Sequence, residues 1–144
     1  MNSASVLPRE QLSKAQRELA FNRVLETGFP SPAGDHLDKT LDLEELLILR
    51  PSATFYVRVE GNAMNRAGIC HNDILVVDRS LTARHGDIVV ASIQDECIVR
   101  RLYKQQQSIM LVSDNPSFEP IPIHEDTHWM VWGVVTHLIH RYRV

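Results

Sequence analysis

The stretch HNDILVVDRSLTARHGDIVVASI, residues 71–93, holds two short apolar runs, Ile74–Val77 and Ile88–Ala91. Both runs are rich in isoleucine and valine, whose branched side chains favour β-strands. Turn-forming residues precede each run, His71-Asn72-Asp73 before the first and Arg84-His85-Gly86 before the second. Because neither run alternates with polar residues, we expect both strands to be buried on their two faces.

Further segments on both sides of this stretch are rich in β-branched and aromatic residues and predict additional strands. The full set of predicted strands is Phe55–Glu60, Ile74–Asp78, Asp87–Ile93, Cys97–Tyr103, Ile109–Val112 and Trp129–Ile139. Short strands separated by turn signals at such regular spacing are typical of a compact all-β domain. The sequence therefore predicts a mostly β domain over residues 41–144.

Residues 1–40 differ in composition from the rest of the chain. The segment Gly28-Phe29-Pro30-Ser31-Pro32-Ala33-Gly34 contains two prolines and two glycines, which exclude a regular helix or strand. We interpret residues 1–40 as an exposed, extended N-terminal arm. Asp42-Leu43-Glu44-Glu45 then fits a capping box and predicts a short helix that continues to about Leu49 and is ended by Pro51.

The overall composition bounds the class of protein. The chain has 144 residues, of which 44% are hydrophobic and 23% charged, and this is enough apolar material for the core of one domain. A net charge of -3 argues against a strongly basic nucleic-acid-binding protein, so we expect no direct sequence-specific DNA binding. The two cysteines form no CxxC pair, and no apolar stretch is long enough to span a membrane. We expect a cytoplasmic protein with reduced thiols and no membrane contact.

Several separated segments form one ordered pattern. They are Gly61-Asn62-Ala63-Met64, Gly68 with Asn72–Asp78, Gly86-Asp87-Ile88-Val89, Val99-Arg100-Arg101-Leu102, and Asn115–Ile121. Their order and spacing resemble the LexA/UmuD family of self-cleaving proteins, whose corresponding pattern is G-[DN]-S-M, G-D-x-[LV]-x-V-D, G-D-[IV]-V, V-K-[RK]-L and N-x-x-[FY]-x-P-I. A lone Gly-Asp pair is a weak signal, whereas this ordered set is specific. The resemblance covers about residues 25–140.

Among the members of this family, the chain is most similar to UmuD, the accessory subunit of translesion polymerase V. LexA and related repressors carry a helix-turn-helix domain ahead of the cleavage site, and the 27 residues before Gly28 are too few for one. The resemblance implies a mostly β, compact LexA-like C-terminal peptidase fold with an extended N-terminal arm. It also implies a homodimer that binds the RecA–DNA filament and partners the UmuC-like catalytic subunit of a translesion polymerase in the DNA-damage (SOS) response.

The resemblance further implies a catalytic site, and the chain departs from it. The family cleaves its own chain with a serine whose proton is accepted by a neutral lysine. The serine position is Ala63, which has no nucleophile, and the lysine position is Arg100, whose guanidinium stays protonated. The family's Ala-Gly or Cys-Gly cleavage site corresponds to Thr27-Gly28, with a bulkier β-branched side chain before the glycine. We predict that the chain does not cleave itself.

No other sequence feature predicts a replacement site. Serines outside any nucleophile motif are Ser80, Ser92, Ser108, Ser113 and Ser117. Cys70-His71 lies in a predicted turn and lacks a second ligand pair at zinc spacing, so we expect no metal and no cofactor. Three histidines in and beside the last predicted strand fall at irregular intervals and are expected at the surface: His128, His137 and His140.

Arg100 and Arg101 leave two interpretations open. Arg100 either pairs with a carboxylate in the lysine slot or swings outward and leaves that slot. The basic pair is also a candidate DNA contact, but the acidic total charge disfavours it.

Three function hypotheses follow. The first is an inactive UmuD-like protein that acts as a dimeric binding partner or regulator of a translesion polymerase. The second is an active UmuD-type Ser–Lys autopeptidase captured as an inactivated variant with Ala63 introduced on purpose, but this change does not explain Arg100 or Thr27. The third is a repressor fragment lacking its DNA-binding domain. The gene sequence at codon 63 distinguishes the first from the second.

Overall fold

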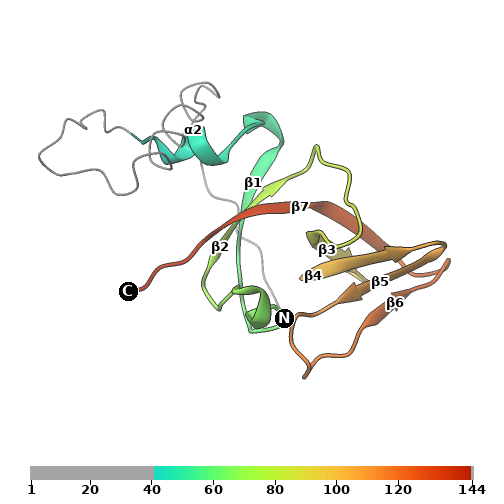
Figure 1. Ribbon diagram of the computed structural model, residues 1–144. Helices are drawn as coiled ribbons and strands as arrows, with labels where there is room; N and C mark the ends of the chain where they lie inside the picture. Colours follow the sequence, from blue (N-terminus) through green and yellow to red (C-terminus); the bar gives the residue numbers. More distant parts are fainter. Residues whose placement is uncertain (1–40, 144) are drawn as a thin grey trace, which may run out of the picture. The chain divides into compact units, whose positions relative to one another are not determined.

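The computed structural model describes residues 41–143, so the predicted arm and the Thr27-Gly28 position lie outside the described residues (Figure 1). Of the described residues, 41–52 belong to one compact unit and 53–143 to another. The division of the chain into an arm up to residue 40 and a β domain from residue 41 stays a prediction. No helix among residues 41–143 is long and apolar enough to cross a membrane.

Helix α2, Leu43–Leu47, begins at the N-cap that the sequence predicts. The Asp42 side chain accepts hydrogen bonds from the backbone N–H groups of Glu44 and Glu45, at 3.1 and 3.4 Å. The helix ends earlier than predicted, because Ile48 already has extended backbone angles of φ -112° and ψ 96°. The expected end near Leu49, with Pro51 as the terminator, was therefore wrong. Pro51 instead begins the 3₁₀ helix η2, Pro51–Ala53.

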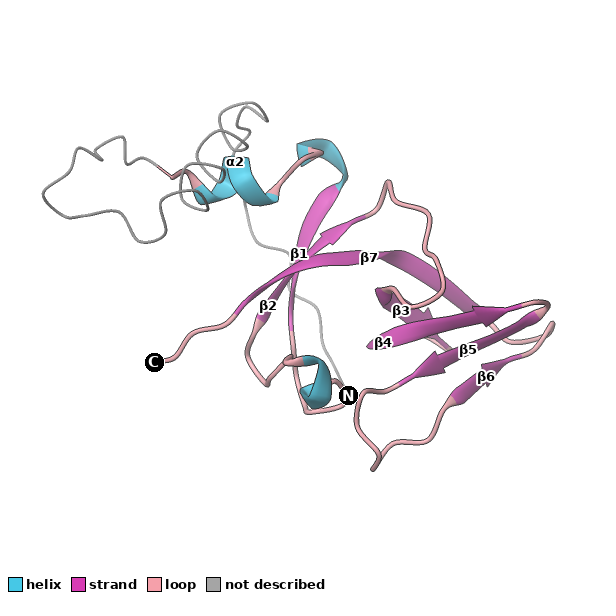
Figure 2. Cartoon of the chain, viewed as in Figure 1, coloured by secondary structure: helices cyan, strands magenta, loops and turns pink. Residues whose placement is uncertain are grey.

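Residues 53–143 form one seven-stranded antiparallel sheet, which confirms the predicted mostly β fold (Figure 2). Its strands are β1 Thr54–Arg58, β2 Ile74–Asp78, β3 Ile88–Ile93, β4 Glu96–Gln105, β5 Ser108–Val112, β6 Ile121–Ile123 and β7 Trp129–Ile139. They are hydrogen-bonded in the order β1-β2-β7-β3-β4-β5-β6. A second 3₁₀ helix, η3 Asn65–Ala67, lies between β1 and β2.

The long strand β7 joins the two parts of the sheet (Figure 1). Its first half pairs with β3 and its second half with β2, and Val134 is the partner of both Val89 and Asp78. The register shifts between Val76 and Val77 on β2, and again between Val90 and Ala91 on β3. The last strand of the chain therefore lies inside the sheet, and the strands at its two ends are β1 and β6.

Two hydrophobic clusters explain why the runs in β2 and β3 do not alternate with polar residues. On β3, Val90 belongs to a cluster with Leu75 and Val77 of β2, while Val89 and Ala91 belong to a second cluster. Successive strand residues point to opposite faces, so an apolar residue is required at every position. The predicted burial on both faces is thereby confirmed for β3. On β2, every residue from Leu75 to Asp78 is buried.

Strand β6 was missed from the sequence. It has three residues, Ile121, Pro122 and Ile123, and pairs only with β5. Proline has no N–H to give to a ladder and is confined to edge strands, which matches its position at the end of the sheet.

Candidate functional site

Ala63, where the resemblance places the family's serine, lies in a turn between β1 and η3. Ala63 and Met64 are 3% and 2% exposed, so these two residues of the turn are buried. Gly61, which follows β1 after Val59 and Glu60, has φ 92°, a conformation that residues with side chains rarely adopt. The backbone N–H groups of Ala67 and Ile69 both donate to the Met64 carbonyl, at 3.0 and 3.2 Å, which closes the turn.

One segment, residues 113–118, fastens this turn to the rest of the β unit. The Asn115 side chain donates to the Asn62 carbonyl at 2.9 Å, and the Arg66 backbone N–H donates to the Asp114 carbonyl at 2.9 Å. The Asp114 backbone N–H in turn contacts the Met64 sulfur at 3.3 Å. The backbone around Ala63 is therefore held by contacts that do not involve the Ala63 side chain.

Arg100, where the resemblance places the family's lysine, is buried on β4 with 6% of its surface exposed. Its Nη1 donates to the Val99 carbonyl at 2.8 Å, and its Cζ lies 5.6 Å from the centre of the Phe118 ring. Its Nε has no hydrogen-bond partner within residues 41–143. Burial lowers the pKa of the Arg100 guanidinium, but arginine remains a cation in proteins.

Neither sequence-based placement of Arg100 matches this geometry. The guanidinium does not point outward, and within the described part of the chain it forms no ion pair with a carboxylate. It instead contacts an aromatic ring and a backbone carbonyl. Burying a cation with so few hydrogen-bond and charge partners costs folding free energy.

Arg101 takes a different environment from Arg100. Its guanidinium binds both carboxylate oxygens of Asp114, with the shortest distance 2.7 Å, and donates to the Gly86 carbonyl at 2.7 Å. The hydrogen bond with Asp114 raises the pKa of Arg101. Asp114 and Phe118 both lie in the segment that holds the Ala63 turn, so Arg101 and Arg100 each contact that segment.

Two serine hydroxyls within residues 41–143 differ in their surroundings. The Ser113 hydroxyl is buried without a hydrogen-bond partner, and the Ser80 hydroxyl donates to Asp78 at 2.6 Å. Across residues 41–143, no hydrogen bond joins a serine hydroxyl to a histidine or lysine.

A cavity of about 300 Å³ lies along one face of β4. Leu102 and Lys104 of β4 line it, and Trp129 and Trp132 of β7 form much of its apolar wall. Arg100 is not among the residues that line this cavity.

Sequence reasoning missed a second group of residues, Cys70, Asp73 and His140. Their side-chain donor atoms lie within 4.8 Å of one another. His140 follows Asp73 by 67 residues, so no spacing rule for metal sites applies to it. The proximity of Asp73 and His140 becomes apparent only from the pairing of β2 with β7.

Comparison with known proteins identifies relatives over most of the chain. Residues 21–136 match the family described as Peptidase S24-like. The protein ImpA of Salmonella typhimurium is 44% identical over 119 residues, which cover 82% of this chain and 80% of ImpA. The protein MucA of Escherichia coli is 43% identical over 115 residues, which cover 78% and 77%. The LexA repressor of Bordetella pertussis is 33% identical over 138 residues, which cover 94% of this chain and 63% of the repressor.

Proposed function

The chain belongs to the Peptidase S24-like family, the family of LexA and UmuD, and on this premise we propose that it is a UmuD-like protein of the DNA-damage (SOS) response that no longer cleaves itself. It acts by binding partners in the cytoplasm. The observation that carries this proposal is the replacement of both catalytic positions, by Ala63 and by Arg100.

Each replacement is sufficient to stop the chemistry. Ala63 has no atom that can attack a carbonyl carbon, and Arg100 has no free electron pair with which to accept a proton at neutral pH. In the protease subtilisin, loss of the nucleophile alone costs roughly a millionfold in rate. The double replacement favours a natural loss of activity over a single inactivating substitution.

A chain that does not cut itself keeps its arm. We propose that in this form it regulates the processed, active form of its relatives.

Homodimer formation is part of the proposal. Large apolar side chains of β7 are exposed, among them Met130 at 49%, Trp132 at 44% and Ile139 at 45%. Such a group on one strand is a candidate interface. The further proposed partners are the UmuC-like catalytic subunit of a translesion polymerase and the RecA filament.

The decisive experiment mixes the purified chain with a UmuC-like polymerase subunit and measures co-elution, with sedimentation of the chain alone beside it. We expect a dimer at micromolar concentration and a stable complex with the subunit. Trp132→Glu should weaken the dimer, while the control Tyr103→Glu, on β4 and 37% exposed, should leave it intact. A chain that sediments as a monomer and does not co-elute with the polymerase subunit would contradict the proposed role as a polymerase-binding partner.

Self-cleavage is tested separately. The chain is incubated with RecA–DNA filaments at alkaline pH and its mass is followed over time. We expect only the full-length mass, and any fragment beginning at Gly28 would refute the loss of activity.

A further inference from the structure

The connection between η3 and β2 forms a tight turn around one carboxylate. The Asp73 backbone N–H donates to the Cys70 carbonyl at 3.1 Å, and Asp73 Oδ2 accepts from the Cys70 backbone N–H at 2.8 Å. Asn72, between them, has φ 73°, the left-handed conformation that asparagine tolerates in turns. These bonds fix the direction of the Asp73 carboxylate, which is 2% exposed, and leave its second oxygen facing away from the turn.

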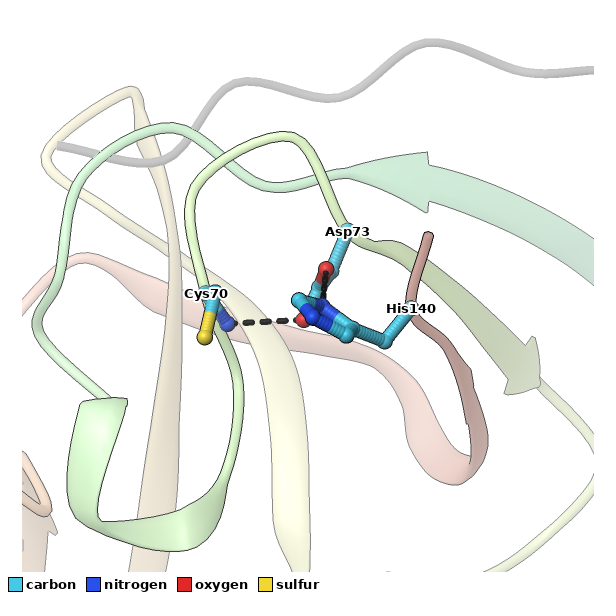
Figure 3. Close-up of side chains that lie close together, drawn as sticks. All are labelled: Cys70, Asp73 and His140. Atoms are coloured by element: carbon cyan, nitrogen blue, oxygen red, sulfur yellow. Dashed lines mark hydrogen bonds and ion pairs between the residues drawn. The ribbon is translucent and has the colours of Figure 1, made fainter. Parts of the chain in front are cut away.

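The pairing of β2 with β7 brings His140 to that second oxygen. Ile74 is opposite Ile139 in the ladder, so the residues next to them, Asp73 and His140, also come together. His140 Nδ1 lies 2.6 Å from Asp73 Oδ1 (Figure 3). The His140 side chain is 37% exposed, and the ring of Tyr142 packs against its edge with centroids 5.0 Å apart.

Cys70 completes the group. It is exposed and reduced, and its thiol lies at the same turn as the carboxylate (Figure 3). One donor atom from each of Cys70, Asp73 and His140 falls within a sphere in which all separations are at most 4.8 Å. Thiolate, imidazole and carboxylate are the three ligand types that zinc accepts in proteins.

We propose that Cys70, Asp73 and His140 bind a zinc ion, with a water molecule as the fourth ligand. In a tetrahedral zinc site with bonds of about 2.0–2.3 Å, neighbouring donor atoms are roughly 3.3–3.8 Å apart. The Asp73–His140 contact of 2.6 Å must open by about an ångström to reach this range. His140 lies at the end of its strand and Cys70 is at the surface, so both side chains have room to make this adjustment.

The surroundings favour a cation in two further ways. A buried carboxylate needs a positive charge or hydrogen bonds to offset its lost hydration, and zinc supplies that charge. The backbone N–H that holds Asp73 Oδ2 is also the kind of outer contact that orients a metal-bound carboxylate. Cys70 and His140 are both exposed, so an ion in solution can reach the group.

The bound ion would fasten the end of β7 to the connection that leads into β2. The Ala63 turn is tied to the same connection, because the Gly61 backbone N–H donates to His71 Nδ1 at 3.1 Å. The site is separate from Arg100 and from the partner-binding role proposed above, and neither requires the other.

Cobalt(II) is the probe for the test, because a tetrahedral cobalt site with a thiolate ligand has a near-ultraviolet charge-transfer band. The full chain, kept reduced, is titrated with cobalt and then with zinc. We expect one cobalt per chain, appearance of the thiolate band, and loss of the band when zinc displaces cobalt.

Two variants test proposed ligands, and two more serve as controls. Cys70→Ser should abolish the thiolate band, and His140→Ala should weaken cobalt binding at least about tenfold. The matched controls are Cys97→Ser, the other thiol, and His128→Ala, an exposed histidine at the opposite end of β7; both should bind as the parent does. All four change residues that are not fully buried, so folding is checked by circular dichroism and expected to hold. Absence of the band in the parent, its persistence in Cys70→Ser, or half an equivalent of metal per chain would each overturn the site.

Discussion

Gly133 of β7 lies directly against Val77 of β2. A Cβ atom placed on Gly133 would come 2.7 Å from Val77 Cγ1 and 2.9 Å from the carbonyl oxygen of Asp78, both shorter than real Cβ contacts. Glycine is therefore required where β7 passes from its partner β3 to its partner β2.

Gly133→Ala should destabilise the fold by about 1–3 kcal/mol, the usual cost of forcing a methyl group into packed surroundings. The midpoint of urea unfolding measures the loss. Val77→Ala removes the nearest clashing atom, so the double variant should lose less stability than the sum of the two single variants. Simple additivity would show that Val77 is not what excludes a side chain at position 133.

Restoring the catalytic pair should restore cleavage only when both members return. Ala63→Ser alone lacks a base and Arg100→Lys alone lacks a nucleophile. The double variant should cut slowly between Thr27 and Gly28, faster at alkaline pH, where more of the lysine is neutral, and faster again with Thr27→Ala. Mass spectrometry after prolonged incubation gives the rates. A triple variant that does not cleave would mean that the geometry of the family's catalytic site has been lost.

The neighbouring arginines should respond in opposite ways to removal of their charge. Arg100→Met replaces a buried, poorly paired cation by an apolar side chain and should leave stability unchanged or raise it by about 1 kcal/mol. Arg101→Met breaks a partly buried pair with Asp114 and should lower stability by about 1 kcal/mol. Urea unfolding of both variants decides the matter, and a large loss in Arg100→Met would show that its contact with Phe118 dominates.

The two thiols should differ in reactivity. Burial raises the pKa of Cys97, whereas Cys70 is exposed, so a thiol reagent should label Cys70 first and Cys97 slowly. The raised pKa also makes stability depend on pH. The folded state keeps Cys97 protonated while the unfolded chain ionises near pH 8.5, so stability is full below that pH and declines as pH rises through it. Cys97→Ala should lack this part of the decline.

Local sequence patterns predicted most of the strands, but they did not predict which strands pair with one another. The apolar runs in β2 and β3 predict these strands, because a strand buried on both faces has apolar residues at successive positions. Strand β6 has only three residues with Pro122 in the middle, too short for any periodic pattern. The central place of β7 was not predictable, since a strand's own residues do not say which strands lie beside it.

The site divides in the same way. Ala63 and Arg100 were assigned to the catalytic positions by resemblance to a family pattern, and this assignment stays a prediction. The contact between Arg100 and Phe118 depends on how residues 113–118 fold back over β4, which no local rule describes. The meeting of Asp73 with His140 depends on the register of two strands far apart in the chain.

Because the two parts of the sheet share strand β7, they are expected to unfold together. Because β7 supplies backbone hydrogen bonds to β2 along one stretch and to β3 along the next, neither hydrophobic cluster can open fully while β7 stays in place. Loss of β7 removes a neighbour from both clusters at once. Residues 53–143 should therefore melt in a single cooperative transition, and the slowest-exchanging amides of β2 and β3 should report one common opening free energy.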